Sequence, residues 1–495
     1  MILIIISILF ITPILSEDRI FSTIQMLDEV QIINSENLQI EQSIMTEFSN
    51  SEDFDCMNFD NEMDCSMADG CEWMMGMCME TEVDCMNFDN EMDCSMADGC
   101  EWMMGMCMEN MDNQDMNTPH FIVLDEINGY WFVTTIASGY IAQFSLVDNT
   151  LIDTFFVGDA PALLAVNEQT KIIYCSRMMP MNGMGDMMPE AESNIIQALS
   201  YSSMGLEEID VQEYEVGSPA PHGLAINHDG TEIYTASNTA DWLYKINLLT
   251  GDITGVVMDE EVANPPDQTT QRLKPIQCLS IGNKLFVSCS AGSWMNPWTG
   301  EQTVIPGKLQ MWNSDDMTLI DVIEFEEHSA PWHIKESPID ELVYVALSGD
   351  NLYDTEGVAC VRYANDELEL DWQINNPNFD TLHGIDVSSD GQNIYVSGRG
   401  DGYIHKINSV GEYIDNVFLG SMSMLGGIAI EKKGFPELGD LNNDLIINVT
   451  DVVLGINIIF NPMMSSPYQN YACDLNIDNV INVVDIVLMV GLILG

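Results

Sequence analysis

A repeat in the middle of this 495-residue chain limits its possible folds more than any other feature. Between residues 118 and 433 one pattern returns roughly every forty to fifty residues. The clearest copy, at 219–260, contains Pro221-His-Gly-Leu-Ala-Ile, an Asn227-His-Asp-Gly turn and Glu232-Ile-Tyr-Thr-Ala-Ser, and ends in two further short runs. Four short β-rich runs joined by Asp-Gly turns are typical of one blade of a β-propeller.

A second clear copy, at 380–420, contains Leu382-His-Gly-Ile-Asp-Val and Asn393-Ile-Tyr-Val-Ser, and Gly426-Gly-Ile-Ala-Ile reads as one more innermost strand. Looser copies begin at Pro119, Pro161, Pro275 and Pro331. Over residues 118–433 this pattern resembles the YVTN/lactonase-like β-propellers. The resemblance implies a mainly β propeller fold. The six clear copies and the partial seventh predict seven blades closed by pairing of terminal strands, and six blades are the alternative. It is specific for the fold and says little about function.

A twelve-residue acidic loop occurs twice near the end of the chain, at 440–451 and 474–485. Oxygen-bearing side chains at loop positions 1, 3, 5, 9 and 12, with a backbone carbonyl at position 7, match the spacing of an EF-hand calcium loop. A solvated acidic loop is the alternative, but two copies with one spacing make it a poor one. The predicted Ca2+ ligands are Asp440, Asn442, Asp444, Ile446, Asn448 and Asp451 in the first site, and Asp474, Asn476, Asp478, Val480, Asn482 and Asp485 in the second.

Each loop leads into an apolar stretch, Val452–Phe460 or Ile486–Leu494, where an exit helix is expected. Aspartate at position 12, the missing entry helix and the tandem copy make residues 438–495 resemble a small α-helical, EF-hand-like type I dockerin. The resemblance implies Ca2+-dependent attachment to a cohesin module in an extracellular or surface assembly, commonly one that degrades polysaccharides. It also implies that loop positions 10 and 11 bind the partner; these are Val449, Thr450, Val483 and Val484.

Two departures from the dockerin pattern matter. Position 6 of the first loop is Leu445, where the positive-φ turn favours Gly, so the first Ca2+ site is expected to be the weaker one. The recognition positions are more apolar than the Ser/Thr pairs common in cellulosomal dockerins, which leaves the class of partner open.

Residues 55–109 hold two identical copies of a cysteine-rich unit, 55–80 and 84–109. An even number of cysteines in so small a unit predicts two disulfides per copy, with the pairing undetermined. The alternative is a soft-metal site for Cu(I) or Zn2+, but no C-x2-C pair is present. The cysteines are Cys56, Cys65, Cys71 and Cys78 in the first copy, and Cys85, Cys94, Cys100 and Cys107 in the second.

The N-terminus reads as a secretory signal. Residues 1–16 are apolar, too short to span a membrane, and end near Pro13 and Ser16. The acidic stretch 17–54 shows few packing signals and is expected to be a spacer. Disulfides persist outside the cytosol, so the cysteine repeats agree with a secreted or cell-surface protein that does not span the membrane.

The charge balance excludes one class of partner. With 14 Lys+Arg against 79 Asp+Glu, the formal net charge of -65 repels nucleic acids and anionic membranes. Cations, above all Ca2+, are the natural counterparts. Solubility alone explains most of this charge without any specific site.

Four histidines occur where a blade enters its innermost strand, and such strands line the central channel. A metal or anion site at the channel mouth is one interpretation, and hydrogen bonding of each ring within its own blade is the other. A one-residue offset of two of the four weakens the first interpretation. These residues are His120, His222, His333 and His383. In a methionine-rich loop nearby, Met178, Met181 and Met184 are candidate Cu(I) ligands, with pliable packing as the alternative.

The few basic residues at predicted blade mouths could attract a small anionic ligand such as a uronic acid or a phosphorylated sugar; they are Arg177, Arg272, Lys274 and Arg399. Four tryptophans could stack on sugar rings, although core packing is commoner; they are Trp294, Trp298, Trp332 and Trp372. No Gly-x-Ser-x-Gly or His-Glu-x-x-His motif is present, so no catalytic residue is assigned. The propeller is expected to bind a ligand or polysaccharide; the alternatives are a lactonase-like hydrolase or lyase and a copper-binding propeller.

Overall fold

The computed structural model describes residues 18–46, 71–74, 77–80, 100–103, 106–109, 117–158, 160–178, 194–259, 265–296, 299–350, 353–421, 423–432, 438–442, 447–460, 465, 469, 472–476 and 480–494. The signal sequence expected at 1–16 lies outside these ranges. Residues 47–117 form a unit of their own, apart from the rest of the chain.

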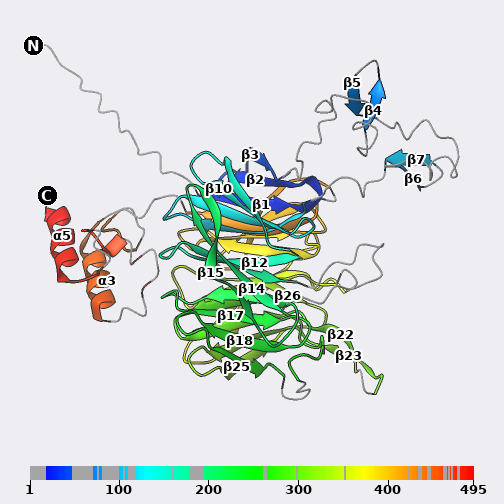
Figure 1. Cartoon of the computed structure of the whole chain (residues 1–495). Coiled ribbons are helices and arrows are strands. Elements are labelled where there is room, and N and C mark those ends of the chain that lie inside the picture. Colours follow the sequence, from blue (N-terminus) through cyan, green and yellow to red (C-terminus); the bar gives the residue numbers. More distant parts are fainter. Residues whose placement is uncertain are drawn as a thin grey trace, which may run out of the picture. The chain divides into compact units, whose positions relative to one another are not determined.

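Seven four-stranded antiparallel sheets form a closed ring, which confirms the mainly β, seven-bladed propeller (Figure 1). The innermost strands contact one another in the order β8, β12, β16, β20, β26, β30 and β34, and β34 contacts β8 again. Six blades pair their strands in sequence order, many of them joined by short turns, and the seventh pairs strands from the two ends of the propeller. The Asp-Gly and Asn-Gly-type turns read from the repeats supply the positive φ that several of these turns need, as at Gly230 and Gly391.

The blades consist of the following strands. The closing blade has β1 (Arg19–Ile24), β2 (Glu29–Asn34), β3 (Ile40–Met45) and β34 (Leu425–Glu431), with a short 3-10 turn, Gln25–Leu27, after β1. The next three have β8 (Pro119–Asp125), β9 (Tyr130–Thr135), β10 (Tyr140–Ser145) and β11 (Leu151–Phe156); β12 (Pro161–Asn167), β13 (Ile172–Arg177), β14 (Ile195–Ser202) and β15 (Gly205–Glu215); and β16 (Pro221–Ile226), β17 (Glu232–Ser237), β18 (Trp242–Asn247) and β19 (Ile253–Val257). The last three have β20 (Pro275–Ile281), β21 (Lys284–Cys289), β24 (Lys308–Asn313) and β25 (Thr318–Glu324); β26 (Pro331–Glu336), β27 (Leu342–Leu347), β28 (Gly357–Arg362) and β29 (Glu369–Asn375); and β30 (Leu382–Val387), β31 (Asn393–Gly398), β32 (Tyr403–Asn408) and β33 (Tyr413–Phe418). A side hairpin, β22 (Gly292–Met295) and β23 (Gln302–Ile305), extends from the β20–β25 blade.

The prediction that residues 17–54 form an acidic spacer was wrong for most of this stretch, which belongs to the closing blade. Residues 19–45, within the stretch 17–54, supply three of its strands, and β1 pairs with β34 from the far end of the propeller (Figure 1, blue strands). Strands β1 and β2 are buried on both faces between neighbouring blades, so they lack the alternation that marks a half-exposed strand. The intervening cysteine repeats also separate them in sequence from the rest of the ring.

A recurring hydroxyl joins five of the seven blades to the next one. In five blades the fifth residue of the second strand is Ser or Thr, and its hydroxyl donates to a backbone carbonyl on the innermost strand of the following blade. In four of these blades the same hydroxyl also accepts an N–H from its own innermost strand, next to a register shift that leaves this N–H unpaired. The residues are Thr23, Thr134, Ser176, Ser288 and Ser397. The hydroxyl therefore satisfies the bulge and fastens the ring.

Removing one such link should be costly. Ser176→Ala is expected to destabilise the propeller by about 1–3 kcal/mol, because the N–H of Leu163 and one bond of the His222 carbonyl lose a buried partner. Denaturant melts of the variant, with Ser203→Ala in an exposed turn as the control, check this. An effect as small as that of the control would contradict the role of the hydroxyl.

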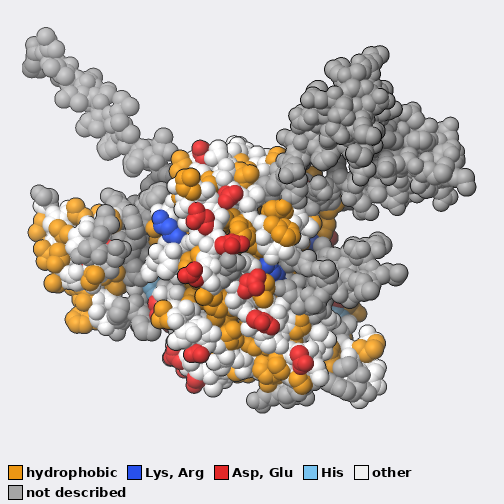
Figure 2. Space-filling view, viewed as in Figure 1, with side chains coloured by type: hydrophobic (Ala, Val, Ile, Leu, Met, Phe, Trp, Pro, Cys, Tyr) orange, Lys and Arg blue, Asp and Glu red, His pale blue; other side chains and the backbone are white. Residues whose placement is uncertain are grey.

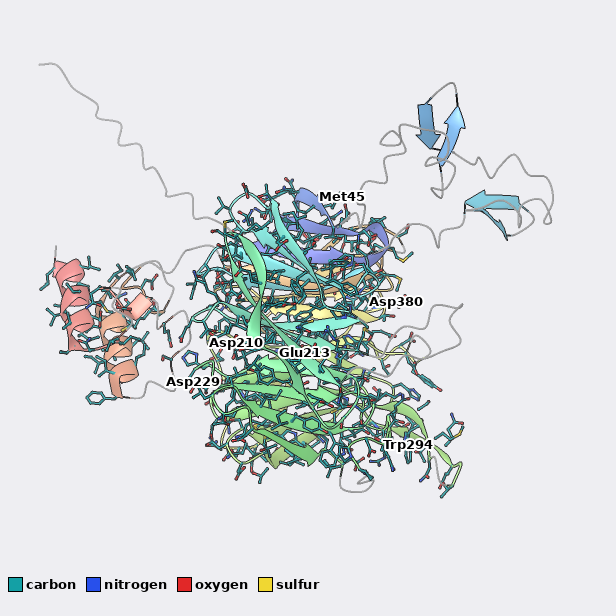
Figure 3. All side chains as sticks on the ribbon, viewed as in Figure 1. Met45, Asp210, Glu213, Asp229, Trp294 and Asp380 are labelled. Atoms are coloured by element: carbon teal, nitrogen blue, oxygen red, sulfur yellow. The ribbon has the colours of Figure 1, made fainter. Side chains whose placement is uncertain are left out.

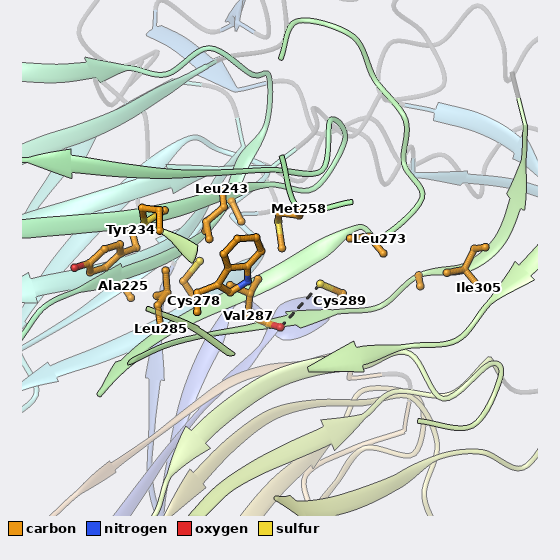
Figure 4. Packing of buried hydrophobic residues seen from close by; sticks show 14 of the residues in the cluster. Ala225, Tyr234, Leu243, Met258, Leu273, Cys278, Leu285, Val287, Cys289 and Ile305 are labelled. Carbon is orange, nitrogen blue, oxygen red and sulfur yellow. Dashed lines mark hydrogen bonds between the residues drawn. The ribbon is translucent and has the colours of Figure 1, made fainter. Parts of the chain in front are cut away.

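The hydrophobic core consists of clusters between adjacent blades. In one of them Leu243 and Tyr234 of the β16–β19 blade interleave with Cys278, Leu285 and Val287 of the next blade (Figure 4). Sheets packed face to face in this way bury both surfaces of most strands, and this burial is the main stabilising contribution to the ring.

Acidic side chains lie on outer strands. Asp210 and Glu213 on β15, the outermost strand of its blade, are exposed to solvent (Figure 3). Charges on an edge strand oppose pairing with the edge of another molecule. Part of the large negative charge therefore has a structural use that requires no ligand.

Among its described residues, the C-terminal region contains the helices α3 (Val449–Phe460) and α5 (Val483–Leu494), each starting three residues before the expected apolar stretch. They contact each other around Leu441, Cys473 and Met489. Gly455 of α3 permits this approach, because an added Cβ would lie 2.7 Å from Cδ1 of Ile486 and 3.2 Å from Sγ of Cys473.

This close approach gives a testable consequence. Gly455→Leu is expected to destabilise the helix pair by about 1–3 kcal/mol, since the larger side chain overfills a packed contact. Gly491→Leu is the matched control, because a Cβ at Gly491 of α5 meets nothing within 4 Å. Thermal melts followed by circular dichroism at 222 nm compare the two; equal melting of both variants would contradict the packing.

In the cysteine repeats the structure describes one hairpin per copy, β4 (Cys71–Met74) with β5 (Met77–Glu80), and β6 (Cys100–Met103) with β7 (Met106–Glu109). The two hairpins have the same register, as expected for identical sequences. Cys56, Cys65, Cys85 and Cys94 lie outside the described residues, and the disulfides of this region stay a prediction. The cysteines with described side chains are free and buried, namely Cys175, Cys278, Cys289, Cys360 and Cys473.

None of the helices in the described ranges is long and apolar enough to cross a membrane.

Candidate functional sites

The described parts of the two acidic loops, at their two ends, are alike. In each loop the aspartate at position 12 is fully buried and turns back over the loop's own backbone. Asp451 accepts N–H bonds from Leu441 (2.9 Å) and Asn448 (2.8 Å). Asp485 accepts them from Asn476 (3.4 Å) and Asn482 (2.9 Å).

The asparagine at position 9 of each loop directly precedes the helix and caps its first turn. The side-chain oxygen of Asn448 accepts the N–H of Thr450 at 2.7 Å, and that of Asn482 accepts the N–H of Val484 at 2.8 Å. These bonds cap α3 and α5 at their N-termini. The sequence repeat is thus also a structural repeat.

The described donors fit a hard cation. Asp440, Asp451 and Asp485 are fully buried carboxylates, and oxygen ligands of this kind suit Ca2+. Asp444, Ile446 and Asp478 lie outside the described residues, so each predicted ligand set is described only in part. Within the described chain, no three His, Cys, Asp or Glu side chains form a metal-binding group.

Apolar side chains cover much of the helix pair's surface. The expected partner-binding positions fall in the first turn of each helix, where Val449 and Val483 are each 67% exposed and Val484 is 49% exposed, and Thr450 is exposed as well. Further along, Phe460 (77%) and other apolar residues are also exposed. Figure 2 shows these side chains as a broad orange surface over the two helices. Sets of exposed apolar residues of this size usually mark an interaction site.

The four histidines of the propeller are all buried at the start of innermost strands, with 2–4% of their surface exposed. The register shifts decide which residues align: His120, His222 and His383 occupy the equivalent position, Trp332 occupies it in β26, and His333 follows by one residue. The interpretation from sequence, which set His120 apart from His222 and His383, was therefore wrong on this point, because it could not place the bulges.

Three of the rings are in direct contact. The ring centroids of His333 and His383 lie 4.7 Å apart and those of His120 and His383 lie 5.2 Å apart, both edge to face. Strand β34 runs between β8 and β30, and its Gly426 and Gly427 have backbone neighbours so close that a side chain would not fit. The glycines thereby let histidines from the two flanking strands meet across β34.

A chain of hydrogen bonds orients one of these rings. Arg399 donates to Oε1 of Gln25 at 2.6 Å, and Nε2 of Gln25 lies 2.8 Å from Nδ1 of His120. Nδ1 of His222 lies 2.6 Å from the carbonyl oxygen of Ile276. Two further ring nitrogens, Nε2 of His333 and Nδ1 of His383, are buried and have no hydrogen-bond partner in the described structure.

All four rings are neutral at neutral pH. Burial, followed by the neighbouring histidines and Arg399, holds the pKa of His120 and His383 well below the usual range. Burial lowers the pKa of His333 to about 3, and it also lowers that of His222. Removing water from around an imidazole disfavours its charged form.

Two carboxyl groups that were not predicted from the sequence lie at the C-terminal ends of neighbouring innermost strands, whereas the histidines lie at the strands' N-terminal ends. Glu126 follows β8 and Glu168 follows β12. Burial raises the pKa of Glu126 to about 7 and, together with Asp125 and Glu126, that of Glu168 to about 8. Their position directly after an innermost strand was the available signal in the sequence. It was not noticed because so many acidic residues occur in this chain.

The basic residues and methionines predicted from the sequence as ligand or copper sites are not brought together among the described residues. Arg177 is buried and donates to the carbonyl of Val157, Arg272 pairs with Asp259, and Lys274 is half-buried. Met178 packs against a core cluster, whereas Met181 and Met184 lie outside the described residues, so the copper site stays a prediction.

Among the tryptophans, Trp294 on β22 belongs to a core cluster and donates to the carbonyl of Thr270 (Figure 3). Trp372 packs against another core cluster and Trp332 lies beside His383. Trp298 is outside the described residues. Core packing, the alternative interpretation, thus holds for Trp294 and Trp372.

Comparison with known proteins places the fold. No model of a known family matches the sequence, and no curated protein matches it. Two solved structures share the architecture: a protein proposed to be a 6-phosphogluconolactonase from Bacteroides fragilis (12% identity, TM-score 0.52, covering 84% of this chain and 98% of that one), and one from Bacteroides uniformis proposed to have the same activity (10% identity, TM-score 0.51, 84% and 99%). At such low identity these likenesses show the fold, a seven-bladed β-propeller like theirs.

Proposed function

We propose that this chain is an exported propeller protein that attaches, through its Ca2+-dependent C-terminal module, to a cohesin-like partner in an extracellular assembly. The observation that carries the proposal is the matched folding of the two acidic loops, each with a buried position-12 aspartate bonded to the loop backbone and an asparagine cap on the helix that follows.

Calcium would couple to docking through the helices. The last three positions of each loop form the first turn of the helix, so one Ca2+ held through Asp451 and another held through Asp485 would fix where α3 and α5 begin. Metal binding that orders a local structure adds its binding free energy to the stability of that structure. Val449 and Val483 would then be held in place for a partner.

The apolar character of these positions favours a partner surface that is itself apolar. Burying a valine side chain at an interface contributes roughly 1.5–3 kcal/mol, and such contributions are concentrated at the centre of an interface. By resemblance, an assembly of this kind would serve polysaccharide breakdown, with the propeller binding a ligand or a polysaccharide.

The docking surface can be tested on the full chain. A panel of purified type I cohesin modules is immobilised, and binding is measured by surface plasmon resonance in Ca2+ and in EDTA. Binding of at least one module in Ca2+ and its loss in EDTA are expected, and Val449→Asp with Val483→Asp should weaken binding at least tenfold because two charges enter an apolar interface.

Val410→Asp is the matched control, since Val410 is 68% exposed on a propeller turn. Binding that survives EDTA, or that the control reduces as much as the helix variants do, would contradict the proposal. Failure of every module to bind in Ca2+ would also contradict it.

A further inference from the structure

The histidine cluster contains a cation without an acidic partner. Arg399 is half-buried at the end of β31, and its side-chain bond goes to the neutral amide of Gln25. None of the ion pairs formed by the described residues includes Arg399. In a chain with 79 Asp+Glu this is unexpected, because a guanidinium that is partly withdrawn from water is normally paired with a carboxylate.

The bond from Arg399 also determines where a proton lies on His120. Arginine can only donate, so the oxygen of the Gln25 amide faces Arg399 and its nitrogen faces Nδ1 of His120. Nδ1 therefore accepts, and the neutral ring carries its proton on Nε2. His120 thus adds an N–H donor, on Nε2, to the donors of the guanidinium in this cluster.

Two more polar atoms in the cluster lack partners. Nε2 of His333 and Nδ1 of His383 are buried and unpaired in the described structure, and both residues are 2% exposed. A neutral imidazole can place its proton on either nitrogen, so each ring can present an N–H to a ligand. Buried polar atoms left unpaired cost free energy that a bound ligand would recover.

The charge of the cluster favours an anion over a cation. The four rings are neutral, so Arg399 supplies the only formal charge among the described groups that bear on them. A divalent cation would add to this charge, and no three metal-binding side chains are grouped within the described ranges. An anion would neutralise the charge and accept from the free donors.

We infer that the end of the propeller channel formed by Arg399, Gln25, His120, His333 and His383 binds a small oxyanion, such as a carboxylate group. The site does not depend on the docking module, so failure of either proposal leaves the other standing. A bound anion stabilises protonated imidazole, and its affinity should therefore rise as the pH falls below 7.

The probes are acetate and inorganic phosphate, titrated into the full-length protein by calorimetry at pH 6.0 and 7.5. Binding of one equivalent of at least one probe is expected, tighter at pH 6.0 and with proton uptake seen as a dependence of the heat on buffer ionisation. Arg399→Gln should weaken binding at least tenfold, roughly the loss of one charge-assisted bond. Arg399→Lys should retain part of the affinity, since the charge remains.

Arg272→Gln is the control, since Arg272 is paired with Asp259 away from the cluster. Unchanged circular dichroism of the Arg399 variants establishes that they fold. The inference is overturned if neither probe binds, if Arg399→Gln binds as tightly as the unmodified protein, or if one equivalent of Zn2+ or Cu2+ binds instead and His383→Gln abolishes that binding.

Discussion

Acidification from pH 6.5 to 5.0 is expected to weaken the contribution of the buried histidines to the stability of the propeller, and His333 alone should lose about 2 kcal/mol of the roughly 5–15 kcal/mol that stabilises a typical domain. The cause is the cluster of His120, His222, His333 and His383. These rings have lowered pKa values in the folded protein and ordinary ones in the unfolded chain. The unfolded state therefore binds more protons below pH 6.5, and stability falls with the pH.

Two opposing effects act on the stability. His333, whose pKa is lowered to about 3, loses about 1.4 kcal/mol per pH unit below its unfolded pKa, or roughly 2 kcal/mol at pH 5.0, and the other three rings act in the same direction. Glu126 and Glu168, with pKa values raised to about 7 and 8, act in the opposite direction. They return roughly 4 kcal/mol over the same range, because the folded state holds their protons and the unfolded state does not.

Chemical denaturation at half-unit pH steps measures this dependence. His383→Gln should reduce the steepness of the loss below pH 6.5 by about one proton. Ser203→Ala, in an exposed turn and without a titratable group, is the control and should leave the slope unchanged. A His383→Gln variant with the same pH dependence of stability as the unmodified protein would show that this ring accepts a proton while folded.

Replacing Glu168 by Gln is expected to stabilise the propeller by as much as about 4 kcal/mol at pH 7.5. At this pH the folded protein keeps the carboxyl largely protonated, since its pKa is raised to about 8, whereas the unfolded chain has it ionised. The protonated Glu168 therefore stabilises the folded protein fully below the unfolded pKa of about 4.5, and this contribution is lost as the pH rises toward the folded pKa of about 8. Glutamine has the shape of the protonated acid and avoids the loss.

The gain should vanish below about pH 4.5, where both states of Glu168 are protonated. Glu207→Gln on β15 is the control, since Glu207 is exposed. Melting temperatures at pH 7.5 and 4.5 distinguish the cases. An equal effect at both pH values would mean that the substituted glutamine acts through packing and that protonation is not the cause.

The blade pattern was readable from sequence because each blade repeats the same turn and strand residues. It predicted the seven-bladed ring, and the fragment at Gly426 is indeed an innermost strand, β34. The other strands of that blade could not be found in this way. Residues 19–45 are far from β34 in sequence, and their buried strands show no alternation.

The convergence of the histidines was predictable, but their partners were not. Gln25 reaches His120 from the 3-10 turn after β1, a segment whose place in the ring depends on closure by β34. Arg399 was singled out for its scarcity, yet its lack of an acidic partner is a property of three-dimensional packing. The register shifts that bring Trp332 into line with His383 are likewise decided by the pairing of whole strands.

Calcium titration of the full-length protein by calorimetry tests the central claim, a Ca2+-dependent C-terminal module, most directly. Two bound Ca2+ per chain with unequal affinities are expected, the first loop being the weaker because of Leu445. Asp451→Ala and Asp485→Ala should each remove one Ca2+, while Asp316→Ala in an exposed propeller turn should remove none. Absence of Ca2+ binding, or binding that survives both loop substitutions together, would contradict the claim.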